Sequence, residues 1–151
     1  MRATIAERVQ QLSFEQRRLA QLIAIAQPMP HAAIRADEAD ALAHLTAESV
    51  VEETKDDVTP RVRLAHPLFA EALTAELAGA ERAALVKEIA ARLMPMGDQQ
   101  LRFTAKVLLA STDAEINNDD LDWAASYAHA AGDHAVAASL AERAQAAERR
   151  F

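Results

Sequence analysis

Histidine is the residue type in this chain best suited to chemistry near neutral pH, because an imidazole can donate, accept or bind a metal ion. His66 stands between an alternating charged and apolar stretch, Arg61–Leu64, and a stretch with helical spacing that begins at Pro67. Backbone N–H groups and the dipole at a helix start favour an anion. We expect His66 either to hydrogen-bond to the nearby backbone or to face a neighbouring domain, where its imidazole could sense phosphate.

Two other groups of residues could in principle hold a metal ion. His129 and His134 lie on opposite sides of Gly132, and no carboxylate stands at ligand spacing from them. Three aspartates among residues 119–122 lack the glycine and the terminal glutamate of a calcium loop. Their charge suits the start of a helix instead. We therefore predict no metal site.

The residue patterns of common enzymes are missing. The chain has 3 glycines, widely separated, and none precedes a Lys-Ser or Lys-Thr pair, so no phosphate-cradling loop is expected. It has no cysteine, which excludes disulfides, thiolate metal sites and cysteine nucleophiles. Nothing resembles a Ser-His-Asp arrangement. The sequence predicts a protein that is not an enzyme.

Composition restricts the class of protein further. The 151 residues are 51% apolar and only 4% aromatic, and alanine is abundant, which favours closely packed helices in one domain or two small ones. No apolar stretch approaches the roughly 20 residues that span a bilayer, and the first residues lack the apolar core of a secretory signal. We expect a cytoplasmic protein that does not bind membranes. The net charge of -7 argues against nucleic acid as a partner.

The first half of the chain has the element order of a winged helix-turn-helix unit. Apolar spacing predicts helices near residues 2–12 and from Ser13 up to the prolines at 28 and 30, with Ser13 and Gln16 forming a capping box. A short helix and a longer one follow before residue 51. Asp37 is a plausible cap for the longer helix.

A β-hairpin is expected next. Val50–Thr54 and Arg61–Ala65 alternate like strands, and the polar residues between them suit a turn. Across the hairpin, two glutamates could face two arginines. These candidate ion-pairing residues are Glu52, Glu53, Arg61 and Arg63.

DNA binding by such a unit would require basic or amide side chains on its third helix. Residues 37–49, which would form that helix, contain four carboxylates and no Lys or Arg. An acidic surface repels a phosphate backbone. We predict no DNA-binding residues in this chain.

From Gly79 onward the chain is expected to be helical throughout. The predicted buried positions of the next two helices are Ala84, Leu85, Ile89 and Leu93, then Leu101, Ala105, Leu108 and Leu109. Thr112–Glu115 fits a second capping box. Leu121–Ala131 and His134–Arg149 should form a helical hairpin, with Gly132 ending the first helix and Asp133 capping the second.

That hairpin carries a partial tetratricopeptide-like pattern. Small residues stand where two helices of such a repeat must nest, at Ala125, Gly132, Ala137 and Ala144. Alanines at 128 and 141 occupy positions where an aromatic residue is usual. Such repeats need about three copies to stand alone, so the hairpin is interpreted as the first unit of a longer array.

Several of these stretches resemble a known family. RVRLAHPLFAEAL, followed by AGAERAALVKEIAARL, is similar to the segment that closes the ATPase module of large LuxR-type transcriptional regulators, which are signal-transducing STAND ATPases. Leu12–Leu19 resembles their L-S-P-E-x-R-x-L helix start, with Phe14 in place of the usual proline. Tyr127–Ala137 resembles the start of their helical repeat array. The resemblance covers essentially the whole chain.

The resemblance implies a role and a set of partners. In that family a nucleotide-binding domain is followed by a winged helix, a helical repeat sensor and a DNA-binding helix-turn-helix, and this chain resembles the middle alone. Walker motifs are absent and no basic DNA-reading unit follows Phe151, so a truncated, split or fragmentary product is expected. His66 matches the winged-helix histidine that contacts the phosphates of bound ADP. ATP or ADP would bind only through a nucleotide-binding domain outside this chain.

The sequence therefore predicts a mainly α protein. Residues 1–78 would form a winged-helix-like domain with one small β-hairpin, and residues 79–151 an α-helical region that opens a tetratricopeptide-like array. The expected function is a regulatory coupling segment that relays nucleotide state to a helical sensor. Its expected partners are those neighbouring domains or a second copy of itself. The alternatives are a free-standing helical module that binds a protein or effector and, least favoured, a DNA-binding winged helix.

Overall fold

The computed structural model of the chain describes residues 2–54, 59–112 and 116–149. The residues cluster into two compact units, Met1–Leu85 and Val86–Phe151. The division falls inside helix α5 (Gly79–Leu93), whereas the sequence placed a boundary before that helix, after residue 78. Most of the described residues are helical, and the single sheet is small, as the sequence predicted.

The first unit begins with two helices, α1 (Arg2–Gln10) and α2 (Phe14–Ala26). The predicted capping box is present, because Ser13 Oγ accepts the Gln16 N–H and Gln16 Oε1 accepts the Ser13 N–H. Arg17 donates from its guanidinium to the carbonyls of Val9 and Gln10, which closes the end of α1. The buried residues of α2 are Leu19, Ala20, Leu22, Ile23 and Ala26.

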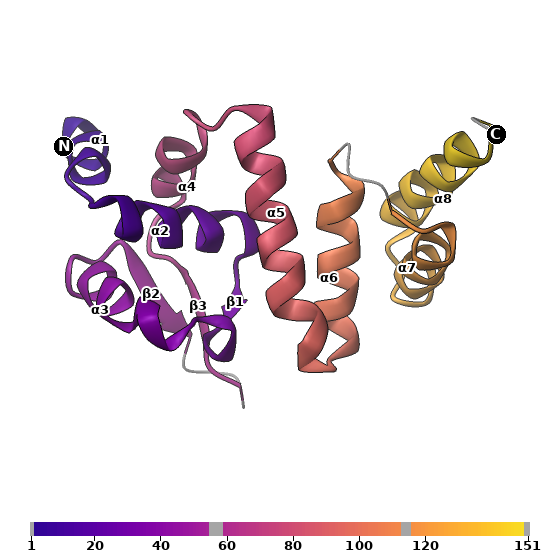
Figure 1. Cartoon of the computed structure of the whole chain (residues 1–151), viewed down its shortest axis with the longest axis horizontal. Coiled ribbons are helices and arrows are strands. Elements are labelled where there is room, and N and C mark those ends of the chain that lie inside the picture. The colour runs from indigo at the N-terminus through magenta and orange to yellow at the C-terminus, as the bar shows by residue number, and fades with distance from the viewer. Residues whose placement is uncertain (1, 55–58, 113–115, 150–151) are drawn as a thin grey trace. The chain divides into compact units, whose positions relative to one another are not determined.

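The sheet of this unit has three antiparallel strands in the order β1-β3-β2 (Figure 1). β2 (Val51–Thr54) and β3 (Arg61–Leu64) form the predicted hairpin. β1 (Met29–Pro30) was not predicted, because a strand of two residues is too short to show a strand period. Its pairing makes β3 the central strand.

Four more short helical elements belong to this unit. Two 3-10 turns, η1 (His31–Ala33) and η2 (Ala36–Glu38), lead into α3 (Ala39–Ala47), and α4 (Pro67–Thr74) follows β3. The prediction that Asp37 caps the third helix is wrong. Residue 37 lies inside η2, and the residue at the N-cap of α3 is Glu38. The Glu38 carboxylate accepts the Arg35 N–H at 2.9 Å and so closes the 3-10 turn.

The remaining elements are helices. α5 is followed by the 3-10 turn η3 (Met94–Met96), α6 (Gln99–Ala110), α7 (Asn118–Ala130) and α8 (His134–Arg149). The buried residues of α5 are Leu85, Val86, Ile89, Ala90 and Leu93. Ala84 is exposed and was wrongly predicted to be buried, because the apolar stripe is centred on the 85–86, 89–90 and 93 positions. On α6, Leu101 and Ala105 are buried as predicted, and Leu108 and Leu109 are half-buried. The predicted capping box at Thr112–Glu115 rests on residues 113–115, which lie outside the described residues.

The α7–α8 hairpin forms as expected, with the two helices side by side (Figure 1). Gly132 has φ 84, the left-handed conformation that suits glycine. The N–H groups of Gly132 and Asp133 bond back to the carbonyls of His129 and Ala128, which is the Schellman pattern, and Asp133 Oδ1 accepts the Val136 N–H. The core of the hairpin is built from Leu121, Ala124, Leu140 and Ala144.

A buried ion pair joins α6 to α7. Lys106 Nζ lies 2.8 Å from Asp120 Oδ2, and the Lys106 side chain is only 6% exposed. Asp119 and Asp120 lie in the first turn of α7 as the acidic run suggested, but the capping side chain is that of Asn117, which accepts the Asp119 N–H. The second acidic residue therefore neutralises a buried ammonium group.

Candidate functional site at the β3–α4 junction

His66 is the N-cap residue of α4. Its backbone is extended, with φ -146 and ψ 139, and Pro67 occupies the first helical position, where a missing N–H costs nothing. The imidazole Nδ1 accepts the Leu68 N–H at 3.1 Å, and the His66 carbonyl accepts the Phe69 N–H at 3.0 Å. The expected hydrogen bond to nearby backbone is confirmed.

The hydrogen bond at Nδ1 determines which hydrogen bond the Nε2 atom of His66 can make. A neutral imidazole that accepts at Nδ1 carries its proton at Nε2. His66 is exposed, as are its neighbours Pro67 and Leu68. The ring therefore presents an Nε2–H donor at the start of a helix whose dipole favours negative charge. Such an arrangement can donate a hydrogen bond to an anionic oxygen.

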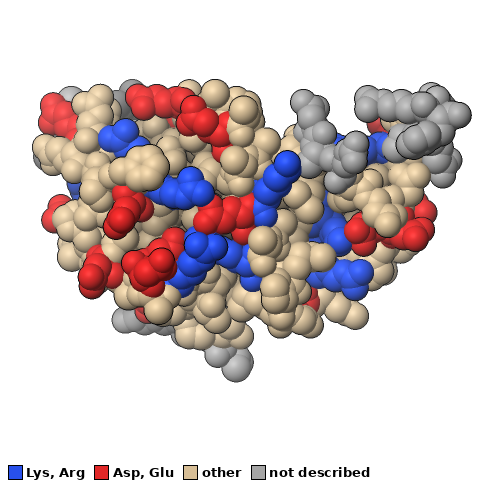
Figure 2. Space-filling view, viewed as in Figure 1, with Lys and Arg blue, Asp and Glu red and all other residues tan. Residues whose placement is uncertain are grey.

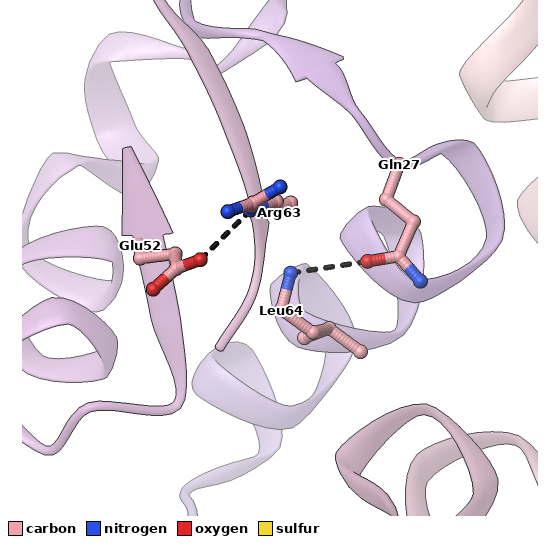
Figure 3. Close-up of polar contacts among 4 residues, drawn as sticks. All are labelled: Gln27, Glu52, Arg63 and Leu64. Atoms are coloured by element: carbon pink, nitrogen blue, oxygen red, sulfur yellow. Dashed lines mark hydrogen bonds and ion pairs between the residues drawn. The ribbon is translucent and has the colours of Figure 1, made fainter. Parts of the chain in front are cut away.

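The strand that leads to His66 is held on both sides. Gln27 Oε1, from the end of α2, accepts the Leu64 N–H at 3.1 Å (Figure 3), and the Val50 carbonyl accepts the Ala65 N–H at 2.9 Å. Val62 and Leu64 are buried on the inner face of the sheet. The junction is consequently fixed by contacts from α2, from the β2 side and from the core.

Gln27 acts as an extension of β1. In the β1–β3 register Met29 lies opposite Val62, so two residues further along Gln27 lies opposite Leu64. Its side-chain carbonyl bonds the strand where the backbone pairing of β1 has ended. Sequence reasoning missed this residue, since a glutamine before a proline carries no local signal for a strand contact.

One of the expected cross-strand ion pairs is present. Arg63 Nε donates to Glu52 Oε1 at 2.8 Å on the exposed face of the hairpin (Figure 3). Glu53 lies opposite Val62 in the register, and its Oε1 is 3.4 Å from Nε2 of His31, which belongs to η1.

A mostly apolar groove runs along α3. Its volume is about 600 Å³, and its lining residues are His31, Ile34, Arg35, Ala36, Ala39, Leu42, Ala43, Thr46, Ala47 and Glu53. Acidic and basic side chains are interspersed on the visible face of this unit, with acidic ones at the α3 end (Figure 2). α3 itself contains no Lys or Arg. The helix that would contact DNA in a winged helix thus carries four alanines and one carboxylate, that of Asp40.

Among residues 2–54, 59–112 and 116–149, no group of three or more His, Cys, Asp or Glu side chains is arranged to hold a metal ion. Within those ranges, no helix combines the length and apolar character needed to cross a membrane. His129 and His134, which the sequence separated by a turn, lie next to each other.

Comparison with known proteins gives no relative: the chain matches no family model, no curated protein and no solved structure.

Proposed function

We propose that the chain is a regulatory coupling segment that relays the nucleotide state of an adjoining domain to a helical sensor, without an ATPase or DNA-binding module of its own. The observation that carries this proposal is the geometry at His66. An exposed Nε2–H donor stands at the N-terminus of α4, and the chain just before it is held by hydrogen bonds that Gln27 Oε1 and the Val50 carbonyl accept. A phosphate bound to a neighbouring domain could therefore accept a hydrogen bond from His66, which the fixed β3–α4 junction holds in place.

The surface of α3 supports a protein partner over a nucleic acid. A helix that contacts DNA needs cationic or amide side chains to hydrogen-bond to the bases, and the cationic ones also gain affinity by displacing counterions from phosphates. Residues 36–48 carry four carboxylates and no Lys or Arg, and they line a groove with alanine side chains. An amphipathic helix of a partner protein can dock in an apolar groove of this kind. In this role the chain would act in the cytoplasm, beside its nucleotide-binding and sensor domains.

The test uses the intact regulator that carries this segment. We expect His66→Ala to weaken ADP binding about 10-fold or more, because a hydrogen bond to a charged group contributes roughly 1.5–3 kcal/mol. His66→Asn is the matched control for folding, because asparagine is also a good helix N-cap but places no donor where Nε2 stands. We expect it to keep the stability of the wild type and to lose ADP affinity as His66→Ala does.

Unchanged ADP affinity in both variants would remove the basis for this function. ATP turnover by the chain alone, or a shifted DNA duplex at physiological salt, would also contradict it.

A free-standing module that binds a peptide or effector is the second candidate, and the groove along α3 favours it. The two functions differ in the surface that they use. Ala43→Arg would fill the groove without touching His66. If a partner binds the chain in the absence of any nucleotide-binding domain and Ala43→Arg abolishes that binding, the module is the better description. A partner that is lost with His66→Asn and kept with Ala43→Arg supports the coupling role.

A further inference from the structure

Two histidines outside the proposed site face each other across the α7–α8 turn. His129 lies in the last turn of α7 and His134 is the first residue of α8. Their Nδ1 atoms are 3.2 Å apart, and the two rings meet edge to face with centroids 4.9 Å apart. Both residues are exposed, so water can reach the pair.

The separation of the two nitrogens matches that of two ligands on one metal ion. Imidazole nitrogens bind Zn²⁺ at roughly 2.0–2.1 Å, so two of them at a tetrahedral angle lie about 3.3 Å apart. The turn itself holds the two ring-bearing residues in place. Gly132 adopts φ 84, and the Asp133 N–H bonds back to the Ala128 carbonyl at 2.8 Å. The backbone is thus organised before any ion arrives.

We propose that His129 and His134 form a two-histidine site for a divalent transition-metal ion of the Zn²⁺, Ni²⁺ or Cu²⁺ class. Imidazole suits these ions better than it suits Mg²⁺ or Ca²⁺, which prefer oxygen ligands. No third His, Cys, Asp or Glu joins the pair among the described residues, so water fills the remaining positions. The Asp133 carboxylate caps α8 through the Val136 N–H and is not counted as a ligand.

Without metal, the same contact is a hydrogen bond in which one Nδ1–H donates to the other Nδ1. Metal binding at both Nδ1 atoms requires the donor ring to carry its proton at Nε2 instead. Each neutral ring keeps one proton, so the exchange releases none. The ion then replaces a shared proton as the link between α7 and α8.

The experiment titrates the whole chain with Zn²⁺ alone and, separately, with Ni²⁺ alone, by calorimetry. We expect one ion per chain, at least a 10-fold loss of affinity in His129→Gln or His134→Gln, and no further loss in the double variant. Glutamine keeps the size and polarity of the side chain, and both positions are exposed, so folding should be kept. His44→Gln, on the exposed face of α3, is the matched control and should bind as the wild type does.

A second readout distinguishes a shared ion from two separate imidazoles. With saturating Zn²⁺ the melting temperature of the wild type should rise, since an ion that binds only the folded state stabilises it. That rise should be absent from both glutamine variants. Affinity that is unchanged in both variants, or two weak sites of which each variant removes one, would overturn the shared site.

Discussion

Gln27 takes the place of a strand residue opposite Leu64, since its Oε1 accepts the Leu64 N–H at 3.1 Å where the backbone pairing of β1 has stopped. Gln27→Ala should remove this bond and lower the free energy of unfolding by about 0.5–1.5 kcal/mol. Gln27→Glu keeps an acceptor oxygen of the same reach and should cost less. Urea denaturation of the two variants checks this. Equal losses would mean that the bond to Leu64 contributes nothing.

His66 should contribute to stability as a helix cap, independently of any nucleotide. His66→Ala removes the acceptor for the Leu68 N–H and should cost about 1 kcal/mol, within the usual range for N-caps. His66→Asn should recover most of that loss. Thermal unfolding of the chain alone measures both variants. If alanine and asparagine are equally stable, the imidazole is not acting as a cap.

Gly132 should resist substitution because of its backbone conformation. With φ 84, an alanine at this position would be forced into the left-handed region at a cost of roughly 1–2 kcal/mol. Beyond the two neighbouring residues, no atom lies within 4 Å of where the Cβ would be, so the cost comes from the backbone conformation and not from a clash with the rest of the protein. Gly132→Asn should cost less than Gly132→Ala, because asparagine tolerates this region.

Gly79→Ala is the control for the glycine prediction, since its Cβ would also meet nothing within 4 Å. Gly79 begins α5, where alanine is the better helix former. Gly79→Ala should therefore leave the free energy of unfolding unchanged or raise it. A Gly132→Ala chain as stable as Gly79→Ala would contradict the argument.

The Lys106–Asp120 pair should respond unequally to the loss of either partner. Asp120→Asn leaves a buried ammonium group without its counter-charge and should cost about 3 kcal/mol or somewhat less, because Asp120 is 32% exposed. Lys106→Met replaces the charge by an apolar side chain of similar length and should be close to neutral. Denaturant unfolding of both variants, compared at one pH, measures the difference. If Lys106→Met lowered the free energy of unfolding more than Asp120→Asn did, the charge pair itself would stabilise the α6–α7 contact.

The features that the sequence predicted are those with a local signal. The capping box at Ser13, the hairpin of β2 and β3, and the turn at Gly132 each depend on residues a few positions apart, whose backbone preferences are set by sterics and short hydrogen bonds. The same holds for the cap at His66, which pairs with a backbone group two residues away.

The features that the sequence did not predict depend on contacts between residues distant in the chain, or on the exact backbone dihedral angles of a turn. The Gln27 contact to Leu64 spans 37 residues, and the burial of Lys106 follows from where α7 packs. For His129 and His134, spacing alone indicated two residues separated by a turn. Whether a turn brings two rings together or apart depends on its dihedral angles, here those of a Schellman turn.

The central position of β3 has a mechanical consequence. The strand is bonded to β1 and Gln27 along one edge and to β2 along the other, and only two residues, Ala65 and His66, separate it from α4. A pull on α4 along the strand direction would load the bonds on both edges together, in shear, instead of opening them one after another. A push or pull at that helix is therefore passed to the whole three-stranded sheet as one stiff body.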